Sequence, residues 1–163
     1  MQPNNKLPLK YQGYTIALQE VPDEISLTFN ISGCTHKCPE CHSKYLWEYK
    51  GHYLGEDLLK VLSIYKEYIS CVCFMGGDQN LEELYTLCKK IKSEELKVCI
   101  YSGSDDIEIF KDFICDSIVD YLKIGSYKQE FGGLDNINTN QKMYKIIDTK
   151  TLDITEQFQK PRL

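Results

Sequence analysis

Residues 71–101 read CVCFMGGDQNLEELYTLCKKIKSEELKVCIY, and their pattern indicates the class of fold. It begins with a short apolar run, Cys71 to Met75, which is typical of a buried strand and ends at a glycine pair. Apolar residues then recur at helical spacing, and a second apolar run, Val98 to Tyr101, follows them. Strand, helix and strand in this order predict a parallel βαβ unit.

The same alternation continues on both sides of this stretch. Further elements are predicted as strands at 14–18, 25–31, 118–124 and 144–147, and as helices at 57–69 and 105–115. No repeat or low-complexity tract indicates an internal boundary. We therefore expect an α/β protein with one domain over residues 1–163, a core of about 11–148 and loose ends.

Polar and glycine-rich segments follow several of the predicted strands. In parallel sheets the functional residues gather at the carboxyl ends of the strands, because these ends share one edge. The segments at these positions are the loop that begins at Cys34, Gly76-Gly77-Asp78, Ser102-Gly103 and Lys123 to Tyr127. We expect all four to lie together.

The first of these loops contains Cys34, Cys38 and Cys41 in a C-x3-C-x2-C spacing. Three thiolates so close in sequence converge only if the loop wraps around a ligand, and sets of thiolates favour iron–sulfur clusters or zinc. Zinc would need a fourth ligand, which His36 or His42 could supply. Three incidental thiols are the remaining alternative. The position after a strand favours a four-iron cluster with one iron left open.

The other five cysteines are predicted to be small core residues, as free cysteines usually are. They are Cys71, Cys73, Cys88, Cys99 and Cys115.

Composition excludes several classes of function. The formal net charge of −5 argues against nucleic-acid binding, which needs a basic surface. The longest wholly apolar run is far shorter than the ~20 residues that cross a membrane, and the N-terminal residues do not resemble a secretion signal. We therefore expect a cytoplasmic protein whose cysteines bind metal rather than form disulfides.

The cysteine loop and its surroundings resemble the radical S-adenosylmethionine superfamily, and within it the activating proteins of anaerobic (class III) ribonucleoside-triphosphate reductases. The segments that carry the resemblance occur in the expected order from about Tyr11 to Ile147. They are 31–43 with Leu46-Trp47, 74–78, 101–103, 123–127, 132–134 and 139–141.

This resemblance implies a partial (incomplete) βα barrel with a mostly parallel sheet, since full barrels typically need ~250 residues. It implies a 4Fe-4S cluster held by Cys34, Cys38 and Cys41, with S-adenosylmethionine on the fourth iron. The residues that the resemblance assigns to S-adenosylmethionine are Gly76, Gly77 and Asp78 at its amino group, Ser102 and Gly103 at its ribose or carboxylate, and Lys123 at the same edge.

The activity that the resemblance implies is reductive cleavage of S-adenosylmethionine and formation of a glycyl radical on the large reductase subunit. A flavodoxin is the usual electron donor in such enzymes. The chain departs from the superfamily pattern at Glu40, where an aromatic residue is common, and at Asp78, where glutamate is commoner.

Two alternatives stay open. One is a radical enzyme of the same kind that acts on another glycyl radical protein or on a small molecule, and the other is a non-catalytic metal-binding adaptor. A partial barrel has a lateral opening, which favours a protein loop as substrate. For His36 and His42 we favour supporting roles over metal ligation, and the roles of Tyr127 and of residues 132–141 stay open.

Overall fold

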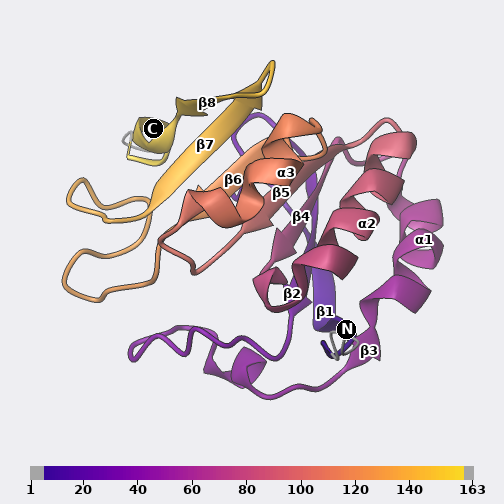
Figure 1. Cartoon of the computed structure of the whole chain (residues 1–163), viewed down its shortest axis with the longest axis horizontal. Helices are drawn as coiled ribbons and strands as arrows, with labels where there is room; N and C mark the ends of the chain where they lie inside the picture. Colours follow the sequence, from indigo (N-terminus) through magenta and orange to yellow (C-terminus); the bar gives the residue numbers. More distant parts are fainter. Residues whose placement is uncertain (1–5, 160–163) are drawn as a thin grey trace, which may run out of the picture.

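The computed structural model describes residues 6–159, and one eight-stranded sheet organises them (Figure 1). The strand order is β3-β1-β2-β4-β5-β6-β7-β8. The strands are β1 (Lys10–Ala17), β2 (Ser26–Ile31), β3 (His52–Tyr53), β4 (Cys71–Met75), β5 (Lys97–Tyr101), β6 (Tyr121–Ile124), β7 (Lys142–Ile147) and β8 (Lys150–Asp153).

The sheet is parallel in its centre and antiparallel on both sides. Strands β2, β4, β5 and β6 pair in parallel, whereas β1 and β3 on one side and β7 and β8 on the other pair antiparallel. The expected α/β class is confirmed. The prediction of a mostly parallel sheet is right only for the centre, because strands joined by short connections, such as β7 and β8, turn back on their neighbours. The sheet is open, with β3 and β8 as its edges.

Three α-helices cover one face of the sheet. They are α1 (Leu54–Tyr65), α2 (Leu81–Ser93) and α3 (Lys111–Cys115), and 3-10 turns occur at η1 (Lys44–Trp47), η2 (Asp78–Asn80), η3 (Ile107–Phe110) and η4 (Thr155–Phe158). The start of α2 is capped by Asn80, whose side chain accepts a hydrogen bond from the Glu83 N–H at 3.2 Å. None of the helices within residues 6–159 is long and apolar enough to cross a membrane.

Both faces of the central strands are buried, so the side chains of β4 alternate between two cores. Val72 and Phe74 pack under the helices, while Cys71 and Cys73 face a second core on the other side. Cys88 and Cys99 are buried as predicted, but Cys115 is exposed. That prediction is wrong because Phe113 is the buried residue of α3, and a residue two positions further on points to another side of a helix.

An ion pair between Glu24 and Lys97 lies beside the second core. The Glu24 side chain is 4% exposed and accepts hydrogen bonds from Lys97 Nζ and from Tyr121 Oη, the latter at 3.1 Å. Burial raises the pKa of Glu24, but hydrogen bonds from Lys97, Ser70 and Tyr121 outweigh it and lower the pKa below its usual value. The carboxylate therefore stabilises the fold in its charged form.

The ordered structure extends beyond the core that the sequence predicts. Strand β8 and the turn η4 follow residue 148, and Ile154 and Thr155 are buried. At the other end Leu9 is 1% exposed, and its N–H donates to a carboxylate oxygen of Glu83 at 2.7 Å. The predicted looseness of residues 1–5 and 160–163 lies outside the described residues, and a single domain over the whole chain stays a prediction.

Candidate metal centre

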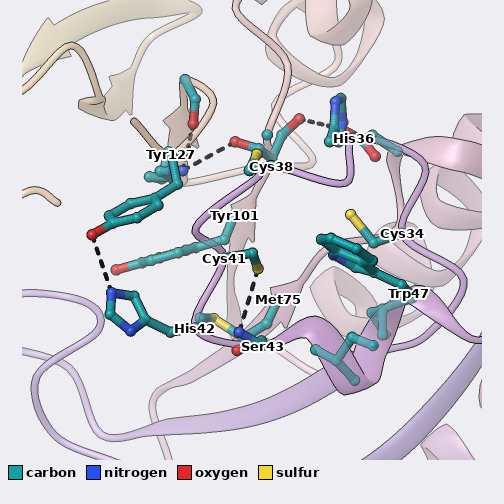
Figure 2. A pocket seen from close by; sticks show the side chains of 18 of the residues that line it. Cys34, His36, Cys38, Cys41, His42, Ser43, Trp47, Met75, Tyr101 and Tyr127 are labelled. Carbon is teal, nitrogen blue, oxygen red and sulfur yellow. Dashed lines mark hydrogen bonds and ion pairs between the residues drawn. The ribbon is translucent and has the colours of Figure 1, made fainter. Parts of the chain in front are cut away.

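A cavity of about 330 Å³ lies at the carboxyl ends of the parallel strands. Its lining includes a residue that follows each of the four central strands, namely Cys34, Gly76, Ser102 and Gly125. Figure 2 shows Met75 and Tyr101, the last residues of β4 and β5, among the side chains that line the cavity together with the cysteine loop. The predicted convergence of four segments at one edge of the sheet is confirmed.

All three cysteines of the loop line this cavity, each partly exposed and without a disulfide partner. The loop is shaped by its own backbone, since the Cys41 N–H donates to the Cys38 carbonyl at 3.0 Å and the Cys34 N–H donates to the Leu46 carbonyl at 3.0 Å. The Ser43 N–H donates to Cys41 Sγ at 3.3 Å (Figure 2). The three thiols therefore line the same cavity, on a loop that is held in shape by its own hydrogen bonds.

The donor set suits an iron–sulfur cluster. Thiolates are soft ligands that suit iron–sulfur clusters and zinc. Within residues 6–159, no group of three His, Cys, Asp or Glu side chains is arranged to hold one metal ion. The three thiols line one cavity of about 330 Å³, so their chemistry and their shared position fit a four-iron cluster.

Asp78 joins the cysteine loop to the end of β4. Its Oδ2 atom lies 2.7 Å from His36 Nε2 and accepts a hydrogen bond from the Ser102 hydroxyl. The Asp78 side chain is only 6% exposed. Because His36 lies between Cys34 and Cys38, this contact holds the loop against the sheet.

Glycines allow the loop and the strand ends to approach closely. Gly76 and Gly77 have φ angles of +113° and +109°, which favour glycine. A Cβ atom on Gly103 would lie 2.8 Å from the His36 ring. Of the residues that the resemblance assigns to S-adenosylmethionine, Gly77 alone does not line the cavity. Ser102 does line it, although its hydroxyl is engaged by Asp78 and by the Ser104 N–H at 3.0 Å.

Lys123 brings a positive group to the same cavity. The residue is 8% exposed, and its Nζ donates to the carbonyl oxygens of Gly125 at 2.8 Å and Ser102 at 3.3 Å. Burial lowers the pKa of Lys123 to about 8, although nearby acidic groups, Cys38 first among them, act in the opposite direction. Asp78 and Lys123 therefore present opposite charges in one cavity.

A second contact joins the cysteine loop to the segment that follows β6. His42 Nε2 lies 3.1 Å from Tyr127 Oη, and the two rings meet edge to face with centroids 5.1 Å apart (Figure 2). In residues 132–141, Gln141 reaches back to the Gly125 carbonyl at 3.3 Å and lines the cavity.

Sequence reasoning missed one further polar residue of the site. Gln79 lines the cavity, and its Nε2 donates to the Ser32 carbonyl at 2.8 Å. Gln79 directly follows the Gly-Gly-Asp segment, so its place after a strand was the available signal. Gln141, which also lines the cavity, belongs to the segment whose role the sequence left open.

Comparison with known proteins gives one match. The model of the 4Fe-4S single cluster domain family matches residues 25–147, which include the three cysteines and all the strand ends around the cavity. Comparisons with curated proteins and with solved structures found no match. Because the family match spans about three quarters of the 163 residues, and because the cavity presents three thiols suited to a cluster, the chain belongs to the 4Fe-4S single cluster domain family.

Proposed function

We propose that this iron–sulfur protein is a radical S-adenosylmethionine activase that forms a glycyl radical on an anaerobic ribonucleoside-triphosphate reductase. The observation that carries the proposal is the composition of one cavity, in which three thiols lie beside a carboxylate and an ammonium group. A 4Fe-4S cluster held by Cys34, Cys38 and Cys41 has one iron without a protein ligand. The methionyl part of S-adenosylmethionine is a zwitterion that could occupy this position.

The chain offers a partner for each charge of that zwitterion. Asp78 would accept hydrogen bonds from the ammonium group, since its Oδ2 is engaged by His36 and Ser102 while no described residue donates to its Oδ1. Lys123 would face the carboxylate. Gly76, without a side chain, leaves the backbone accessible to the cofactor.

The cluster and S-adenosylmethionine would supply reductive cleavage of a sulfonium bond and hydrogen-atom abstraction from a glycine of the reductase. The protein would hold the two groups in register and exclude water. Met75, Tyr101 and Trp47 give the cavity an apolar lining for this purpose. The His36–Asp78 contact would keep the ligand loop at a fixed distance from the cofactor site.

The open sheet supports a protein rather than a small molecule as substrate. Strands β3 and β8 do not pair with each other, so the fold does not surround the cavity in the way a closed barrel would. An open sheet of this kind would admit a glycine-containing loop of the large reductase subunit. We further propose a flavodoxin as electron donor and an oxygen-poor cytoplasm as location, because an open-iron cluster is sensitive to oxygen.

The test begins with anaerobic reconstitution with iron and sulfide. We expect broad brown absorption, formation of 5′-deoxyadenosine when reductant and S-adenosylmethionine are added, and a glycyl radical signal in electron paramagnetic resonance (EPR) with the cognate reductase. Cys34→Ala should abolish all three, whereas Cys115→Ala, which removes an exposed thiol outside the cavity, should leave them unchanged.

The possible failures distinguish the alternatives. Cleavage without a glycyl radical on the reductase would remove the reductase as substrate and favour another protein or a small molecule. An intact cluster that never cleaves S-adenosylmethionine would contradict both enzyme hypotheses and favour the adaptor.

A further inference from the structure

One residue in the wall of the cavity carries a buried polar atom without a partner. Trp47 Nε1 is shielded from solvent and makes no hydrogen bond to any described residue. Two other side-chain atoms share this condition, on Ser26 and Asn140, but Trp47 alone of the three residues lines the cavity. An indole N–H that is buried normally finds an acceptor, because leaving it unpaired costs free energy.

The position of Trp47 is fixed relative to the first cysteine. Trp47 ends the turn η1, and the preceding residue, Leu46, accepts the hydrogen bond from the Cys34 N–H at 3.0 Å. Leu46 is itself buried. Figure 2 shows the indole ring and the Cys34 side chain among the groups that line the cavity. The unpaired donor therefore belongs to a residue of the same cavity wall as the first cysteine.

The same loop already directs an N–H group at a ligand sulfur. The Ser43 N–H donates to Cys41 Sγ at 3.3 Å. Hydrogen bonds to cluster sulfurs and to cysteine ligands are one of the ways in which proteins set the reduction potential of an iron–sulfur cluster. A donor from Trp47 would act in the same way on the opposite end of the C-x3-C-x2-C segment.

We propose that Trp47 Nε1 donates a hydrogen bond to a sulfur of the cluster or of its Cys34 ligand and thereby raises the reduction potential of the cluster. The reduced cluster carries one more negative charge than the oxidised one, so a donor stabilises it more. A tenfold preference for the reduced form would shift the midpoint potential by about 59 mV for one electron.

The chain has a single tryptophan, which allows a direct test. Tryptophan labelled with ¹⁵N at the indole nitrogen would mark Trp47 alone. Pulsed EPR of the dithionite-reduced cluster should then show a ¹⁵N coupling, together with a proton coupling that disappears in D₂O. Absence of both would overturn the proposal.

The second measurement is a redox titration of the reconstituted cluster. Trp47→Phe should shift the midpoint potential to more negative values. Tyr45→Phe, in an exposed residue of the same turn that does not line the cavity, should leave it unchanged. If Trp47→Phe does not hold a cluster, replacement of the single tryptophan by benzothienylalanine keeps the ring shape and removes only the N–H. The comparison uses whichever Trp47 variant holds a cluster. If its midpoint potential equals that of Tyr45→Phe, the role of Trp47 is packing alone and the proposal is refuted.

Both measurements are made without S-adenosylmethionine. Their failure would leave the proposed activity untouched, and a protein that never cleaves S-adenosylmethionine could still show the coupling and the shift.

Discussion

Replacing Asp78 by asparagine tests the cofactor site most directly. The substitution keeps the size of the side chain and removes its charge. In the proposed site the carboxylate would accept a hydrogen bond from the ammonium of S-adenosylmethionine through Oδ1, the oxygen to which no described residue donates. A hydrogen bond to a charged group contributes about 1.5–3 kcal/mol, so the loss of one should weaken binding about 10- to 150-fold.

The assay is the dissociation constant of S-adenosylmethionine, measured by anaerobic equilibrium dialysis against protein with a reconstituted cluster. Asp116→Asn is the matched control, because Asp116 is hydrogen-bonded to Tyr85 and lies outside the cavity. Iron content is measured alongside, so that a lost cluster is not mistaken for lost affinity. An Asp78→Asn protein with a full cluster and unchanged affinity would refute the assignment of Asp78 to the ammonium group.

Three other substitutions test different parts of the structure. Because Lys123 has its pKa lowered to about 8 and is charged only below that value, the affinity for S-adenosylmethionine should fall as pH rises through 8, and Lys123→Met should flatten this dependence in the same dialysis assay. Glu24→Gln should lower the free energy of unfolding by about 1–3 kcal/mol at pH 7. Folding lowers the pKa of Glu24, so the charged carboxylate stabilises the protein fully at pH values above the pKa of Glu24 in the unfolded chain. The difference in unfolding free energy between the wild type and Glu24→Gln, measured by urea denaturation, should therefore shrink as the pH falls through the pKa of Glu24 in the folded protein. Gly103→Ala would place a Cβ atom 2.8 Å from the His36 ring and should reduce iron bound per protein, whereas Gly133→Ala, with only ordinary contacts, should not.

The sequence predicted the centre of the fold well, because buried parallel strands are continuous apolar runs. The runs at β4 and β5 and the apolar stripe of α2 lie where the pattern placed them. The convergence of four strand ends followed from the topology of a parallel sheet. Strand β8 was missed because all its residues are exposed and show no alternation.

Contacts between distant side chains could not be predicted. The pair of His36 and Asp78 joins residues 42 positions apart, and neither residue type requires the other. The unpaired Trp47 nitrogen became visible only once the packing around it was known. The sequence thus identified the residues that would hold a cluster, while the groups that would adjust its properties emerged from three-dimensional contacts.

The anchoring of the cysteine loop has a consequence for how the protein survives damage. The Cys34 N–H donates a backbone hydrogen bond to the Leu46 carbonyl. The side chains of His36 and His42 join the loop to Asp78 and Tyr127. These attachments involve protein atoms only, unlike the zinc–ligand bonds on which a zinc finger depends. We therefore expect a molecule that loses its cluster to oxygen to keep the loop in place and to be reloaded with iron and sulfide without passing through an unfolded chain.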